Sequence, residues 1–197
     1  KYVPNIDQSS ITEEGLCPIR LKLINGKVQE ISPLNVKKQL PNQILLPRFA
    51  EPHAHLDKAF SWGKASNLEG TYQQALGANE QEHQTRTPSL VRKKAERCLV
   101  TALGNGIRAI RTHIDSFGPQ AIESWEVLLD LRNQWKERID LQLVALVPIE
   151  YWRTIEGKSF ASFIAKKKGL LGGVVVPPFH AESLEDSLTE MIILAEE

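Results

Sequence analysis

Hydrophobic and basic residues alternate in the segment 17–31, on both sides of Asn25-Gly26. An Asn-Gly pair readily adopts the positive φ angles of a tight two-residue turn, so this pattern predicts a β-hairpin. A further apolar run, Ile44-Leu45-Leu46, leads into the segment 47–57. Its composition is that of a buried strand.

From residue 87 onward the pattern changes to alternating helices and strands. Thr87-Pro88 is typical of a helix start, and an apolar stripe at helical spacing continues from there to Gly104. The later segments alternate strand and helix three times, over 107–114, 125–135, 141–147, 160–169, 172–176 and 184–195. Such alternation indicates an α/β fold, with a parallel sheet covered by helices.

The predicted strands start near residues 52, 107, 141 and 172. With their helices they occupy about 145 residues, whereas a closed TIM-type (β/α)8 barrel needs ~250. We therefore expect about the first four βα units of such a barrel. The chain lacks an initial Met, which is compatible with a trimmed, a processed or a fragmentary protein.

The composition limits the classes of partner and compartment. The 197 residues include 24 basic and 24 acidic side chains, and this balance predicts no nucleic acid and no anionic membrane surface as partner. A small-molecule substrate fits better. Two cysteines without C-x-x-C spacing argue against a disulfide framework and a zinc ribbon. No apolar run approaches the ~20 residues of a membrane span, and the start does not resemble a signal peptide, so we expect a cytoplasmic protein.

His53 and His55 are the main candidates for chemistry. On a strand, residues two apart point to the same face with Cα atoms roughly 6 to 7 Å apart, so their imidazoles can converge on one zinc or iron ion. A bare His-x-His pair also arises by chance on exposed strands. Here the pair follows an apolar run and precedes the βα series, and this context favours a metal site.

Three segments together resemble the amidohydrolase superfamily, and most closely its cytosine-deaminase-like and triazine-aminohydrolase-like branches. The resemblance extends from about residue 17 to 197 and rests on Pro47 to Phe60, Arg111 to Asp115 and Asp140 to Ala145. In the triazine branch the histidine pair is followed by Asp-Lys, as it is here by Asp57-Lys58.

The resemblance implies a metal-dependent hydrolase of carbon–nitrogen bonds in a cyclic amidine, nucleobase-like or triazine-like substrate. Residues 1–48 would be the N-terminal part of a small β-sandwich domain, and 49–197 the first half of the barrel. One divalent ion, zinc or iron, would be held by His53, His55 and two ligands beyond Glu197. No catalytic residue would lie in this chain, because the general acid and base is also expected beyond Glu197.

Two departures from the family pattern narrow these expectations. In cytosine deaminases the third strand ends with a glutamine that reads the pyrimidine, whereas Val147-Pro148-Ile149-Glu150 stands here, so cytosine is not the expected substrate. The predicted fourth strand, 172–176, lacks the lysine that bridges two ions in binuclear relatives. This favours a single metal ion.

Other polar residues have two interpretations each. Lys58 either binds a polar edge of the substrate or pairs with Asp57 or Glu51 on a loop. We expect His113, at a strand end, to have a structural role rather than to bind metal, and His83 to be solvated. His180, after Pro177-Pro178, either reaches a substrate from the loop after the fourth strand or, as we rather expect, is a surface histidine.

The whole chain also has two interpretations. It is either an enzyme or enzyme fragment, or a non-catalytic or split-subunit half barrel. In the second case it would form a homo-oligomer or pair with a complementing C-terminal half that covers its open sheet edges.

Overall fold

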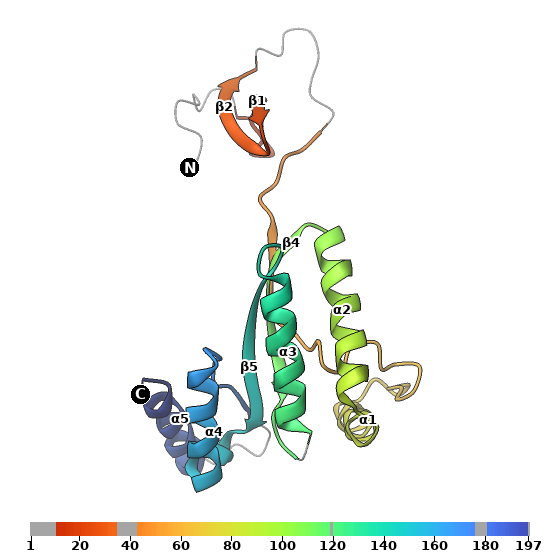
Figure 1. Ribbon diagram of the computed structural model, residues 1–197, viewed down its shortest axis with the longest axis vertical. Coiled ribbons are helices and arrows are strands. Elements are labelled where there is room, and N and C mark those ends of the chain that lie inside the picture. The colour runs from red at the N-terminus through yellow and green to blue at the C-terminus, as the bar shows by residue number, and fades with distance from the viewer. Residues whose placement is uncertain (1–10, 35–42, 119, 176–180, 197) are drawn as a thin grey trace. The chain divides into compact units, whose positions relative to one another are not determined.

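The structure is a computed structural model and describes residues 11–34, 43–118, 120–175 and 181–196. The chain divides into two compact units between Pro47 and Arg48, and each unit is described by itself (Figure 1). No helix in the described ranges is both long enough and apolar enough to cross a membrane.

The described part of the first unit contains an antiparallel hairpin of β1 (Ile19–Ile24) and β2 (Lys27–Pro33). Asn25 and Gly26 have φ angles of 51° and 72°, as a type I′ turn requires, so the predicted hairpin is confirmed. The described residues of the first unit form two strands only. They do not show the expected β-sandwich, which stays a prediction.

The apolar run 44–46 is not the buried strand that its composition predicts. Ile44, Leu45 and Leu46 form no strand and are 67%, 68% and 57% exposed. Apolar residues favour burial, but they are buried only where another part of the protein packs against them. The strand prediction for these residues was therefore wrong.

The second unit is built on a curled parallel sheet with the strand order β3-β4-β5-β6. The four strands are β3 (Phe49–Ala54), β4 (Ile107–Asp115), β5 (Asp140–Pro148) and β6 (Gly173–Val174). This matches the predicted first part of a (β/α)8 barrel. The fourth strand is shorter than predicted, and residue 176 of the prediction lies outside the described residues.

The helices connect these strands. They are α1 (Tyr72–Gln84), α2 (Pro88–Gly104), α3 (Ala121–Trp135), α4 (Ile155–Lys166) and α5 (Ala181–Glu196), with a short 3-10 helix η2 (Ile149–Arg153) after β5. Helices α2 to α5 were predicted. As expected, α2 is capped by the Thr87 side chain, which accepts a hydrogen bond from the Leu90 amide. The helix α1 was not predicted.

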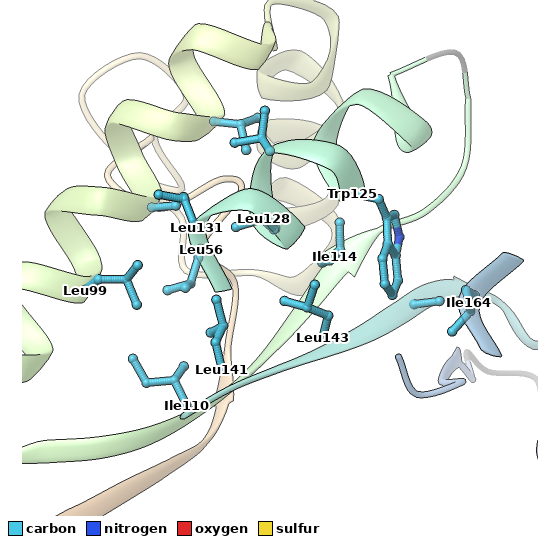
Figure 2. Close-up of a cluster of buried hydrophobic side chains, with 14 of the residues drawn as sticks. Leu56, Leu99, Ile110, Ile114, Trp125, Leu128, Leu131, Leu141, Leu143 and Ile164 are labelled. Atoms are coloured by element: carbon cyan, nitrogen blue, oxygen red, sulfur yellow. The ribbon is translucent and has the colours of Figure 1, made fainter. Parts of the chain in front are cut away.

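The core lies between one face of the sheet and the helices α2 and α3 (Figure 2). Alternate residues of β5, beginning with Leu141 and Leu143, are buried there against Leu99 of α2 and Leu128 of α3. On the opposite face of the sheet, Arg111 Nε donates a hydrogen bond to Gln142 Oε1 at 2.9 Å, and both residues are exposed.

Candidate active site

Three histidines lie together at the carboxyl end of the two neighbouring strands β3 and β4. His53 is in β3, His55 is the first residue after it, and His113 is in β4. The ring centroids of His53 and His113 are 4.0 Å apart and stacked, and that of His55 lies 5.2 Å from His53 and 5.8 Å from His113. The pair predicted from the sequence is therefore brought together, in a cluster that also contains His113.

The imidazole of His55 has a defined orientation. Its Nδ1 lies 3.0 Å from the backbone carbonyl oxygen of His113. A carbonyl oxygen can only accept, so Nδ1 must carry the proton and Nε2 is left as a free electron pair. Burial, followed by the charge of Lys58, lowers the pKa of His55 to about 4. The ring is therefore neutral at neutral pH, which is the form that binds metal ions.

The ring of His113 is partly buried. Burial and the neighbouring His53 lower its pKa. Its Nδ1 is buried and has no hydrogen-bond partner among the described residues. The backbone oxygen of His113 orients His55, whereas the structural role expected for the His113 side chain stays a prediction.

The residues present fit one part of a metal site. The imidazoles of His53 and His55 are neighbours, and His55 is oriented by the hydrogen bond at its Nδ1. Zinc and iron sites use imidazole ligands with an outer hydrogen bond of this kind. Catalytic zinc sites take three protein ligands. Among the described residues, no group of three or more His, Cys, Asp or Glu side chains has an arrangement that could hold an ion. A metal site at these histidines would therefore need further ligands.

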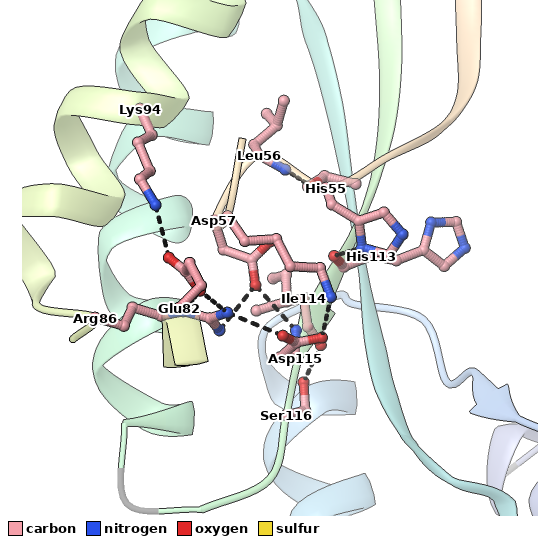
Figure 3. A network of polar contacts seen from close by, with 12 residues as sticks. His55, Leu56, Asp57, Glu82, Arg86, Lys94, His113, Ile114, Asp115 and Ser116 are labelled. Carbon is pink, nitrogen blue, oxygen red and sulfur yellow. Dashed lines mark hydrogen bonds and ion pairs between the residues drawn. The ribbon is translucent and has the colours of Figure 1, made fainter. Parts of the chain in front are cut away.

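A buried network of charges lies next to the histidines (Figure 3). At its centre is Arg86, in the short link between α1 and α2, whose side chain is 1% exposed. Its guanidinium group contacts Asp57 at 3.2 Å, Asp115 at 2.9 Å and Glu82 at 2.5 Å. Arg86 thus joins the segment after β3, the end of β4 and the end of α1.

Two lysines complete this network. Lys58 Nζ lies 2.7 Å from Asp115 Oδ1, and Lys94 Nζ lies 2.6 Å from Glu82 Oε1. With Arg86, the three cations balance the three carboxylates of Asp57, Glu82 and Asp115. Buried charges need such pairing, because an unpaired ion in the interior is strongly destabilising.

The three carboxylates differ in their proton affinity. Burial, followed by the charge of Asp115, raises the pKa of Asp57 to about 6. Burial alone would also raise the pKa values of Asp115 and Glu82, but the contacts with Lys58, Arg86 and Lys94 outweigh it and hold both below their usual range. Asp57 Oδ2 also accepts a hydrogen bond from the Asp115 amide at 3.1 Å, which connects the ends of β3 and β4.

Lys58 lies beside the histidines but is paired with Asp115, and not with the two carboxylates proposed from the sequence, Asp57 and Glu51. Its side chain remains 18% exposed. The central residue Arg86 was not predicted, because the polar stretch 79–86 shows no apolar period. His83 of this stretch is half-buried and stacks on Phe117 at 5.2 Å, so it is less solvated than expected.

No protein-family model matches the chain. The curated relatives that it resembles are a deaminase and an amidohydrolase. The sequence is 33% identical over 173 residues to a pterin deaminase of Rhizobium rhizogenes, covering 83% of this chain and 39% of that protein. It is 21% identical over 202 residues to the N-isopropylammelide isopropyl amidohydrolase of Pseudomonas sp., covering 97% of this chain and 48% of that protein. The chain thus spans less than half the length of these relatives.

Two solved structures have the same fold. A 5-methylcytosine deaminase from Klebsiella pneumoniae superimposes with a TM-score of 0.73 at 23% identity, over 90% of this chain and 45% of that one. An N-isopropylammelide isopropylaminohydrolase from Burkholderia multivorans gives a TM-score of 0.64 at 18% identity, over 90% and 46%. The chain is homologous to part of amidohydrolases of the cytosine-deaminase-like and triazine-hydrolase-like kind, over less than half of their length.

Proposed function

We propose that this chain supplies the first part of the active site of a metal-dependent amidohydrolase that hydrolyses a carbon–nitrogen bond of a cyclic amidine. The observation that carries the proposal is the orientation of His55, whose Nδ1 is held by the backbone of His113 while its Nε2 remains free beside His53. The relatives that are deaminases and amidohydrolases support the reaction class.

In this proposal His53 and His55 would hold one divalent ion, zinc or iron. Such an ion lowers the pKa of a bound water molecule, so that hydroxide is available at neutral pH. The residues of this chain hold the two imidazoles in place. The His113 carbonyl oxygen fixes the tautomer of His55, and the Arg86 network connects the strand ends that carry the histidines. The remaining ligands and the proton-transferring group would come from later strands of the barrel.

Lys58 is proposed to contact the substrate. An ammonium group has three N–H donors. Asp115 Oδ1 accepts one hydrogen bond from Lys58 Nζ at 2.7 Å. The partly exposed side chain therefore retains donors for a ring nitrogen or a carbonyl oxygen of the substrate. Its pairing with Asp115 would hold the ammonium group in one position and reduce the entropy lost on binding.

The proposed substrate is a pterin-like or triazine-like ring rather than cytosine. The 33% identity to a pterin deaminase supports a ring of this kind. At the end of β5, where related cytosine deaminases would carry a glutamine, Ile149 is 2% exposed and belongs to the core. A ring whose polar atoms are left without partners binds less well, by ~1 to 3 kcal/mol for each atom.

The test is ammonia release by the intact natural protein, supplied with zinc or iron, from pterin, aminotriazines and cytosine. We expect turnover of pterin or a triazine and poor turnover of cytosine. His53→Ala and His55→Ala should abolish turnover and reduce the bound metal, whereas His83→Ala, a control outside the cluster, should retain both. Efficient turnover of cytosine above the other rings would contradict the substrate proposal. Full activity of both histidine variants would contradict the site.

A second candidate is a split subunit or a non-catalytic half barrel that requires a partner. It is favoured by the polar, exposed sheet face at Arg111 and Gln142, and by the end strands β3 and β6, each of which pairs on one side among the described strands. The mass of the natural gene product distinguishes the two cases. A product that contains a fifth strand with a histidine supports the enzyme, and a short product isolated with a second chain supports the split subunit.

A further inference from the structure

A cavity of about 340 Å³ lies in the second unit, among the segment after β3, helix α1 and helix α2. Its wall includes the apolar side chains of Phe60, Ala65 and Leu90. None of the three clustered histidines lines it, so it is separate from the candidate metal site. Cavities of roughly 300 Å³ and more are large enough for a small organic ligand.

The charged side chains around this cavity are mostly cationic. Lys64, Lys93, Lys94 and Arg97 line it, and Glu82 is the one carboxylate among its described lining residues. Both oxygens of Glu82 are already engaged, Oε1 by Lys94 and Oε2 by Arg86. Glu82 therefore balances the charge of Lys94 but not the charges of Lys64, Lys93 and Arg97.

Lys64, Lys93 and Arg97 form no ion pair with any carboxylate in the described part of the chain. Three uncompensated cations around one hollow concentrate positive potential there, because a low-dielectric wall focuses the field. A surface lysine is ordinarily solvated, but the gathering of three such charges around a cavity with an apolar wall is the arrangement that binds an anion.

The guanidinium of Arg97 lies over an aromatic ring. Its Cζ is 4.1 Å from the centroid of the Phe60 ring, a cation–π contact. Phe60 has a φ of 57°, in the left-handed region that bulky residues seldom adopt. The backbone is therefore held in an unfavourable conformation at the residue that supports Arg97. A stacked guanidinium keeps the N–H groups of its edge available for two-point binding of carboxylate or phosphate.

We propose that this cavity binds a small organic anion. Its carboxylate or phosphate group is held by Arg97, Lys93 and Lys64, and its apolar body lies against Phe60 and Leu90. The site is distinct from the proposed catalytic one, and its occupation does not depend on metal binding.

The test is calorimetric titration of the intact natural protein at low ionic strength with benzoate, phenyl phosphate, inorganic phosphate and the neutral control benzamide. We expect the two aromatic anions to bind about tenfold more tightly than inorganic phosphate, a difference of about 1.4 kcal/mol, and benzamide not to bind. Arg97→Gln and Lys93→Gln should each weaken binding of the aromatic anions at least about tenfold. The matched controls Arg48→Gln and Lys136→Gln, at exposed positions away from the cavity, should leave it unchanged.

Equal weakening in the four variants would overturn the proposal, because it would indicate nonspecific attraction to surface charge. Absence of binding at millimolar concentrations would also overturn it. A further segment of the intact protein that fills the cavity would have this effect. Preference of phosphate over carboxylate probes identifies the anionic group. Thermal melts of each variant show whether it is folded, and if Arg97→Gln unfolds, the exposed Lys93→Gln decides the test.

Discussion

Arg86 connects three segments that are distant in the sequence, through Asp57 after β3, Asp115 at the end of β4 and Glu82 in α1. The three carboxylates are buried. Without the guanidinium, Asp57 loses its cation partner, and Asp115 and Glu82 retain only Lys58 and Lys94. In a buried network the loss of one partner costs more than the pair contributes, because a buried ion left without its partner can be neither solvated nor paired.

We expect Arg86→Met to lower the free energy of unfolding by about 3 to 5 kcal/mol. The measurement is chemical denaturation of the intact protein. Arg92→Met is the matched control, since Arg92 pairs with Asp130 and Glu96 on the exposed surface of α2 and α3, and it should cost less than about 1 kcal/mol. Equal losses in the two variants would show that the Arg86 network does not hold the strand ends together.

The pKa of His55 predicts a dependence of stability on pH in the metal-free protein. It is about 4 in the folded state and 6.5 in an unperturbed chain. As the pH falls from 6.5 towards 4, the unfolded chain takes up a proton that the folded protein does not, so stability decreases. The raised pKa of Asp57 acts in the opposite direction between about pH 4 and 6, because the folded state then retains the proton.

Comparison with His55→Gln isolates the contribution of His55, since Asp57 is present in both proteins. In EDTA, the free energy of unfolding should fall more steeply between pH 7 and pH 5 in the natural protein than in the variant. Solvent screening of the partly exposed ring reduces this difference. Parallel pH profiles would show that His55 is not kept neutral by its surroundings.

At the scale of single elements, helix α4 starts against η2 with almost no space between them. Thr154 caps α4 by accepting a hydrogen bond from the Gly157 amide at 2.9 Å. A Cβ atom at Gly157 would lie 2.0 Å from the carbonyl oxygen of Tyr151. The close approach of α4 to η2 therefore requires glycine at this position.

We expect Gly157→Ala to destabilise the protein by several kcal/mol, about 2 to 4, because backbone atoms rather than a flexible side chain have to move. Gly77→Ala is the matched control. Gly77 lies in α1 with nothing within 4 Å of the added carbon, so alanine should stabilise the helix by about 0.5 to 1 kcal/mol. Thermal melts of both variants test the pair, and a Gly157→Ala protein as stable as the natural one would refute the packing argument.

At the scale of the whole molecule, the proposed metal site would need ligands besides the histidines of this chain. Two imidazoles are fewer than the three protein ligands of a catalytic zinc site. We therefore expect the 197-residue chain by itself to bind zinc more weakly than about 1 μM, as measured by calorimetry. One-to-one binding tighter than this, abolished by His53→Ala, would show that another residue such as His113 or Asp57 completes the site.

The open sheet predicts the association state of the same chain. The end strands β3 and β6 are paired on one side only among the described strands, and unpaired strand edges favour pairing with other chains. We expect the isolated chain to self-associate or to require a complementing fragment, as measured by sedimentation velocity. A compact monomer at micromolar concentration with a cooperative melt would contradict this.

The sequence by itself determined the elements whose local pattern and tertiary role agree. The turn at Asn25-Gly26, the helix that begins at Thr87-Pro88 and the apolar strand 141–147 all follow from backbone preference and hydrophobic period. The pair His53 and His55 was also visible, because residues two apart at the end of an extended strand lie close together.

Only the tertiary structure decided which distant residues meet. Helix α1 has no apolar stripe, and its one buried residue is Glu82, which pairs with Arg86. These charges can be buried only because Asp57 and Asp115 also contact Arg86. In the same way, the cavity brings Lys64, from the segment after β3, together with Lys93 and Arg97 of α2, and Arg97 lies over the Phe60 ring. Contacts of this kind depend on long-range geometry and complementary charge, which no local period along the chain encodes.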